Sequence, residues 1–319
     1  MFTDLAPSFR NYLELHFIVF IWGFTAILGK LISIPAVELV FARTFIAAAA
    51  LALILYFKKI SFRIGRKQIL KIISVGFLIS AHWILFFASA RISSVAICLA
   101  GMSTVSLWTA ILEPIFTSKK IKAHELFMSF LIIVGLYLIF RFEFNHLAGI
   151  IMAVVSAMLS AIFTIINARL VQQHRPLVIS CYELAGACLA TTLFFPFYTL
   201  YLTDTGSLNL NLSWLDGVWL LLLALVCTVY PFTSSVRLMQ RISAFTVNLS
   251  VNLEPVYGIL FALLIFKDDE HMSMGFYLGA AIILCSVFSH ALIEGYLTRR
   301  QKITTAPATT GTLPETPIL

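Results

Sequence analysis

The residues best suited to do chemistry in this sequence are an acid and a proline in the middle of an apolar segment. Glu254 lies near the midpoint of segment 243–266 and is followed by Pro255. A carboxylate at the centre of a membrane helix costs on the order of 3 kcal/mol on insertion scales, so it should face protein or water. Pro255 cannot donate a hydrogen bond to the carbonyl oxygen of Val251, so it should kink the helix and expose backbone acceptors. Glu254 is therefore a candidate proton, cation or ligand site; the alternative is a structural hydrogen bond between helices.

Further polar side chains surround Glu254 at helical spacing. Tyr257 shares the face of Glu254, whereas Asn248 and Asn252 lie on another face of the same segment. Polar groups on two faces indicate a helix surrounded by protein. The asparagines are candidates for a binding cavity, and the alternative is that they hold neighbouring helices together.

A second polar stripe runs along segment 93–116. Ser106, Thr109 and Glu113 recur at the spacing of one helix face. This stripe is expected to line one half of a cavity opposite Glu254. The alternatives are hydroxyl bonds back to the backbone of the same helix and a Glu113 at the membrane interface.

Arg43 lies about two turns inside segment 36–57, too deep for a loop residue. A cation at this depth needs an anionic partner or a watery cavity. Glu38, five residues earlier, has poor helical spacing for pairing, so Glu254 or Glu183 would have to supply the partner. Arg43 is then either half of a buried ion pair or the counter-charge for a carboxylate ligand.

Two aromatic-containing pairs complete the candidate site. His82-Trp83 and Tyr230-Pro231 lie at nearly corresponding positions of the two halves of the chain. His82 could titrate near neutral pH and relay protons. The alternative is a hydrogen-bonded core histidine.

Enzymatic chemistry has no motif to carry it. The sequence contains no phosphate-binding Gly-rich loop with lysine, no HExxH and no GxSxG. The five cysteines lack the spacing of metal ligands. We expect a protein that is not an enzyme and that holds no cofactor and no metal.

Composition places the chain in a membrane. Of its 319 residues, 60% are hydrophobic and 12% charged, and the mean hydropathy is +0.96. A membrane helix needs roughly 20 apolar residues, and the sequence offers ten such runs. They are 13–34, 36–57, 69–90, 93–116, 123–140, 146–170, 177–202, 215–236, 243–266 and 273–297. The predicted fold is all-α, with ten transmembrane helices.

The cations indicate orientation. If loops alternate between the two sides, 17 of the 22 Lys and Arg residues lie on the side of the N-terminus and four on the other, with Arg43 inside a helix. The positive-inside rule then places both termini in the cytoplasm and the protein in the plasma or inner membrane. The net charge of +7 lies in loops rather than on one soluble face, so no nucleic-acid partner is expected.

The chain carries a weak internal repeat. Arg91-Ile92-Ser93 recurs 150 residues later as Arg241-Ile242-Ser243. At about the same offset, the basic segment 119–122 corresponds to the acidic segment 267–270. Five helices per copy force the second copy to be inverted, which is characteristic of secondary transporters. At this offset Thr104 and Val105 correspond to Glu254 and Pro255, so we expect the two copies to differ in function at the midplane of the membrane.

With these features the chain resembles the drug/metabolite transporter superfamily, in particular its EamA type of ten helices in two inverted five-helix repeats. The resemblance rests on Trp22-Gly23, Arg43 and Leu253-Glu254-Pro255-Val256, and on Glu270-His271-Met272-Ser273 before a Gly-containing last segment. It implies one repeat over 13–141, a second over 146–297, and a disordered cytoplasmic tail over 304–319.

The resemblance also implies a function. It suggests a secondary transporter of small metabolites or amino-acid-like compounds, often moved outward, as a monomer or homodimer. Coupling to a proton or another cation would involve Glu254. The alternatives are a lipid-linked carrier flippase of the same superfamily and a non-transporting membrane scaffold or sensor.

Overall fold

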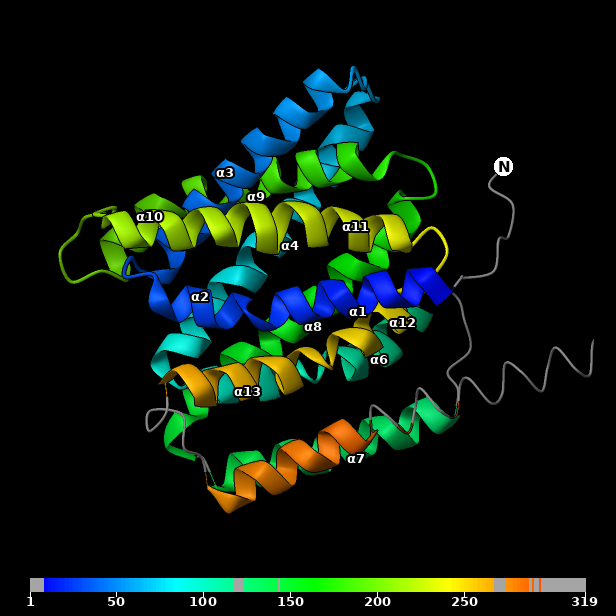
Figure 1. The fold of residues 1–319 in the computed structure, drawn as a ribbon, viewed down its shortest axis with the longest axis vertical. Coiled ribbons are helices and arrows are strands. Elements are labelled where there is room, and N and C mark those ends of the chain that lie inside the picture. Colours follow the sequence, from blue (N-terminus) through cyan, green and yellow to red (C-terminus); the bar gives the residue numbers. More distant parts are fainter. Residues whose placement is uncertain are drawn as a thin grey trace, which may run out of the picture.

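The computed structural model describes residues 9–117, 123–142, 144–266 and 273–286, together with 289 and 293. In this part of the chain all regular secondary structure is helical (Figure 1). The elements are α1 (Phe9–Gly23), α2 (Thr25–Leu31), α3 (Ala36–Phe57), α4 (Arg66–Ile92), α5 (Val95–Met102), α6 (Val105–Thr117), α7 (Ala123–Phe142), the 3-10 turn η1 (Phe144–His146), α8 (Leu147–Leu170), α9 (Pro176–Tyr201), α10 (Trp214–Leu221), the π-helix η2 (Leu222–Val229), α11 (Tyr230–Leu238), α12 (Ala244–Val251), α13 (Glu254–Phe266) and a last helix, Met274–Ser286. Segments 119–122 and 267–270 and the tail 304–319 lie outside the described residues.

Eight helical stretches of the described chain are long and apolar enough to cross a membrane. Four of them join elements end to end: Phe9–Leu31, Val95–Thr117, Trp214–Leu238 and Ala244–Phe266. Two shorter apolar helices, Phe130–Ile139 within α7 and Met274–Ser286, accompany these eight. The all-helical membrane fold is therefore confirmed, and the count of ten spans stays a prediction.

The stretches α5–α6 and α12–α13 lie side by side and run in opposite directions. The contacts join α5 to α13 and α6 to α12. Two hydrogen bonds give the same direction: the Asn252 amide donates to the Ser106 hydroxyl at 2.7 Å, and the Asn248 amide donates to the Thr109 hydroxyl at 2.8 Å. Residue numbers therefore rise along one stretch as they fall along the other, as expected for inverted repeats.

Both of these stretches are interrupted at matching points. The helices before the breaks both have 8 residues. Their two bounds, and the start of the helix after each break, differ by 149 between the copies. The equivalence deduced from Arg91-Ile92-Ser93 is therefore wrong by one residue here. Val105 corresponds to Glu254, and Ser106 corresponds to Pro255.

The two breaks share a backbone form and differ in side chains. In each, two successive N–H groups donate to carbonyl oxygens three residues earlier: Thr104 to Gly101 in the first, for example, and Leu253 to Ser250 in the second. In the first break the hydroxyl of Thr104 also donates to the carbonyl oxygen of Gly101, at 2.8 Å. Pro255 is therefore not what distinguishes a broken helix from a continuous one in this chain.

The stretch Trp214–Leu238 contains the eight-residue π-helix η2 directly before Tyr230-Pro231. Pro231 has no N–H to donate, and widened turns often occur where the regular ladder is interrupted. Inside η2, the Thr228 hydroxyl donates to the Leu223 carbonyl oxygen at 2.7 Å.

Hydrogen bonds connect the two halves at the end where α2 finishes and α10 begins. The backbone N–H and the hydroxyl of Ser33 donate to the Asp216 carboxylate at 2.8 and 2.7 Å. The backbone N–H of Asn209 donates to the Glu38 carboxylate at 3.1 Å. Arg91 donates to the carbonyl oxygens of Gly29 and Ile32 and so caps the C-terminus of α2.

The helix Met274–Ser286 packs on α7 at one end of the longest axis, with α3 at the other (Figure 1). Gly135 and Gly279 make this contact close, because a Cβ on either would lie within 2.7 Å of the carbonyl oxygen of the other. Small residues let membrane helices approach in this way.

Candidate functional site

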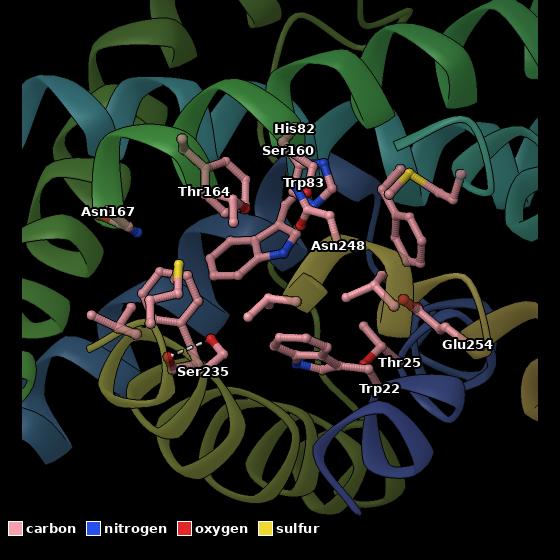
Figure 2. A pocket seen from close by; sticks show the side chains of 18 of the residues that line it. Trp22, Thr25, His82, Trp83, Ser160, Thr164, Asn167, Ser235, Asn248 and Glu254 are labelled. Atoms are coloured by element: carbon pink, nitrogen blue, oxygen red, sulfur yellow. Dashed lines mark hydrogen bonds between the residues drawn. The ribbon is translucent and has the colours of Figure 1, made fainter. Parts of the chain in front are cut away.

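A cavity lies between the two halves of the chain (Figure 2). The centre of a water molecule can occupy about 70 Å³ of it. Since one buried water needs roughly 10–15 Å³ of such space, the cavity has room for several waters or a small solute. Its walls combine aromatic rings with a few polar groups, and the residues discussed below are Trp22, Thr25, Arg43, His82, Trp83, Ser160, Phe163, Thr164, Asn167, Phe232, Asn248 and Glu254.

Arg43 of α3 is only 1% exposed and lines this cavity. Its guanidinium carbon lies 4.0 Å from the centre of the Trp83 ring, and its Nε donates to the Thr228 hydroxyl at 2.7 Å. The second donor, Nη1, has no hydrogen-bond partner among the described residues. The π-helix thus places the hydroxyl that orients Arg43, and the ring of Trp83 supports the cation.

Glu254 is the first residue of α13, directly after the break, and is 7% exposed. Figure 2 places its side chain beside Thr25 and Trp22, with Asn167 at the opposite end of the view. The N-terminus of a helix favours negative charge, so the break itself supplies an electrostatic reason for an acid here. Neither Glu254 nor Arg43 takes part in an ion pair within the described chain.

Glu183 does not supply the partner for Arg43 either. It is 0% exposed on α9, and its Oε2 accepts from the Asn167 amide at 3.4 Å. Asn167 lines the cavity, whereas Glu183 lies behind it. Arg43 is held instead by an aromatic ring and a hydroxyl.

His82 and Trp83 of α4 both line the cavity. The Nδ1 of His82 lies 2.9 Å from the carbonyl oxygen of Ser156 and 2.8 Å from its hydroxyl. The Ser156 hydroxyl also lies 2.9 Å from the carbonyl oxygen of His82. His82 therefore has an anchored ring that still reaches the cavity, a geometry compatible with both interpretations given above.

A polar stripe of α8, which was not among the residues predicted from the sequence, also lines the cavity. Ser160, Thr164 and Asn167 all line the cavity. Their spacing of four and three residues places them on one face. This spacing was the available signal, but small hydroxyls in membrane helices commonly bond to their own backbone.

The remaining candidates lie in different places. Asn248 lines the cavity and also bonds to Thr109, whereas Asn252 and Ser106 form a bond within the helix contact. The oxygen Oδ1 of Asn252 is buried and has no partner in the described region.

Tyr257 packs edge-on against Phe20 at 5.4 Å between ring centres, and a Cβ on Gly23 would lie 2.8 Å from its own Cβ. Tyr230 is 42% exposed and lies edge-on to Phe17. Neither tyrosine is among the residues that line the cavity.

Glu113 lies in a second cavity, at the end where α6 and α8 finish and α12 begins. Thr117, Arg169 and Ser243 line it with Glu113. Met239 lines both cavities and so separates them. The predicted stripe is therefore divided: Ser106 and Thr109 lie in the contact with α12, and Glu113 lies in the second cavity. The described residues contain no cluster of three or more His, Cys, Asp or Glu side chains suited to a metal.

Comparison with known proteins gives the following matches. The model of the EamA-like transporter family matches the chain twice, over residues 13–141 and 147–291. A solved structure titled "Crystal structure of protein" shares the fold with a TM-score of 0.65, covering 89% of this chain and 98% of that chain at 14% identity. In all, 25 chains of solved structures match, and no curated protein does. At this identity the structural likeness concerns the fold alone.

Proposed function

Because this chain belongs to the EamA-like transporter family, with both halves matched, we propose that it carries a small metabolite or amino-acid-like compound by alternating access. Family membership and the apolar helices make it a multi-pass membrane transport protein. The substrate, the direction and the mechanism below are our proposal.

The observation that carries the proposal is a cavity holding an arginine and a glutamate that do not pair with each other in the described chain. Arg43 keeps Nη1 without a partner, and Glu254 keeps its carboxylate at the cavity wall. A buried charge is stable when it is paired, and within the described residues neither of these groups forms an ion pair. A substrate with a carboxylate and an ammonium group would pair both, the carboxylate with Arg43 and the ammonium with Glu254.

The cavity walls favour an apolar group between these two charges. Trp22, Trp83, Phe163 and Phe232 line it. Small-molecule sites typically combine such walls with a few polar groups that fix orientation. A lipid-linked carrier has less support, because the cavity is small and its lining residues come from both halves of the chain.

Alternating access needs two ends that open in turn. At one end the bonds of Ser33 with Asp216 and Asn209 with Glu38 hold the halves together. At the other end the second cavity approaches the first, with Met239 between them. We propose that this conformation is closed on the outer side, with both termini cytoplasmic and transport directed outward across the plasma or inner membrane.

The proposal is tested by thermal unfolding of the purified protein in the presence of individual amino acids and related zwitterions. A ligand present at 100 times its Kd stabilises the folded state by about 2.7 kcal/mol, so a true substrate raises the Tm. We expect apolar zwitterions to raise it and the corresponding amides and esters, which lack the carboxylate, to leave it unchanged. Stabilisation by polyprenyl phosphates alone would contradict the proposal and favour the flippase.

A further inference from the structure

Glu183 is a second buried acid, and it lies behind the cavity wall rather than in it. It is 0% exposed on α9, where α4 packs closely. A Cβ on Gly76 of α4 would lie 2.4 Å from the carbonyl oxygen of Glu183, and a Cβ on Gly186 would lie 2.5 Å from the carbonyl oxygen of Ile73. The two backbones are in contact here, which holds α4 and α9 close together beside the acid.

Polar atoms around this acid are left without partners. Its Oε2 accepts from the Asn167 amide at 3.4 Å, whereas its Oε1 has no partner among the described residues. The same holds for the Oδ1 of Asn167 and for the hydroxyl of Ser180, which is 0% exposed and lies one turn before Glu183. Buried polar groups are almost always hydrogen-bonded, so a Glu183 carboxyl that can donate an O–H suits these surroundings better than a carboxylate that can only accept.

Four charged or titratable groups of the surrounding helices bond to other residues. Arg43 of α3 binds Thr228, His82 of α4 binds Ser156, and Arg237 of α11 pairs with Glu14. Tyr182, beside Glu183, donates to the carbonyl oxygen of Phe62 at 3.0 Å. Within the described chain Asn167 is thus the one side chain that bonds to this carboxyl. A bare carboxylate in such surroundings would need a cation or several donors.

Asn167 connects this acid to the cavity, which it lines with Thr164 and Ser160. An amide has donors at one end and an acceptor at the other. Beside an ionised Glu183 the amide turns its N–H inward, as it does here. A protonated Glu183 has an O–H to donate as well as an oxygen that accepts, so it allows the amide to turn Oδ1 inward and to present N–H to the cavity.

We propose that Glu183 is a proton-binding site and that Asn167 transmits its occupancy to the transport cavity. The proton binds to a carboxylate oxygen from one side and is released to the other, so no redox partner is needed. The inference rests on the proposed transport function for its coupling step, whereas the binding site itself does not. Figure 2 shows Asn167 at the far end of the cavity from Glu254, which separates this proton site from Glu254.

The site is tested first without any substrate. Infrared spectra of the purified protein are recorded as the pH is raised, and the carbonyl band of a protonated carboxyl group is followed. We expect a titrating band that disappears in Glu183→Gln, persists in Glu254→Gln and is shifted in Glu183→Asp. An unchanged band in Glu183→Gln, or no titrating band assignable to Glu183, would overturn the proposal even if transport is established.

The coupling is tested in proteoliposomes with a mixture of radiolabelled apolar amino acids. With one proton per substrate, a gradient of one pH unit sustains about tenfold accumulation in the wild type. We expect Glu183→Gln to abolish this accumulation and to keep downhill exchange. Asn167→Leu should give the same loss while the Glu183 band still titrates, which a purely structural role would not produce.

The outcomes separate the two proposals. Absence of all uptake in the wild type would count against the proposed function and leave the infrared result to decide on the site. Accumulation by Glu183→Gln equal to that of the wild type, or accumulation that follows a sodium gradient instead, would overturn the coupling role.

Discussion

The two interrupted helix stretches, α5–α6 and α12–α13, share a shape and differ in chemistry. Both have an 8-residue helix before the break, and the helix after the break starts at an equivalent position in each. In the first, the Thr104 hydroxyl bonds to a nearby carbonyl oxygen and Val105 begins α6. In the second, Asn252 bonds across to Ser106 and Glu254 lines the cavity.

The interruption of the helix is therefore common to both repeats, whereas the carboxylate of Glu254 is specific to the second and is the part that we connect with transport. A break needs only a two-residue turn, which small hydroxyls satisfy as well as a proline does. Of the two breaks, the second alone begins its half-helix with a carboxylate, Glu254, which in the proposed function binds the ammonium group of the substrate. The asymmetry expected from sequence therefore concerns side chains and not the backbone.

Replacing the charge in the second break has the largest expected effect. Glu254→Gln keeps the size of the side chain and removes a charged hydrogen-bond partner worth about 1.5–3 kcal/mol. We expect transport of the compound identified by thermal unfolding to fall by about 10- to 100-fold in proteoliposomes.

The control is Thr104→Val in the first break, one residue before Val105, which corresponds to Glu254. It should leave the transport rate within about twofold of the wild type, because the Thr104 hydroxyl bonds to the nearby carbonyl oxygen of Gly101. An equal loss in the two variants would show that the breaks are functionally alike.

Removing the proline has a smaller effect. Pro255→Ala should change the free energy of unfolding by less than about 1 kcal/mol, because the first break forms without a proline. Reversible unfolding in mixed detergent micelles measures this. If Pro255 alone interrupted a regular helix, relief of its cost would instead stabilise the protein by about 3 kcal/mol.

Removing a bond between the two stretches has the smallest effect. Asn252→Leu loses the bond to Ser106. Hydrogen bonds between membrane helices contribute about 0.6 kcal/mol on average, so unfolding should become easier by about that amount. Ligand affinity should stay unchanged, since Asn252 does not line the cavity. A large loss of affinity in this variant would place Asn252 in the site after all.

The sequence predicts the fold better than the site. Long apolar runs follow directly from bilayer thickness, so the helical membrane architecture is readable without a structure. Charged and aromatic residues at membrane depth, such as Arg43, Glu254 and Trp83, were also identified, since burial of a charge has few harmless explanations.

Side-chain direction could not be predicted in the same way. Periodicity shows that Ser106 and Thr109 share a face, but not that this face meets asparagines of another helix. The π-helix changes the rotation of every residue after it, so Tyr230 could not be oriented from its position in the repeat. The stripe of Ser160, Thr164 and Asn167 was missed because small polar residues in membrane helices are usually silent.

The central claim is that Arg43 and Glu254 bind opposite ends of one transported molecule. Its most direct test is equilibrium binding of the radiolabelled stabilising compound to wild type, Arg43→Met, Glu254→Gln and Thr104→Val in detergent. Loss of either charged contact should weaken the Kd by about tenfold or more, with Thr104→Val unchanged. A Kd within about twofold of the wild type in both charge variants would contradict the account.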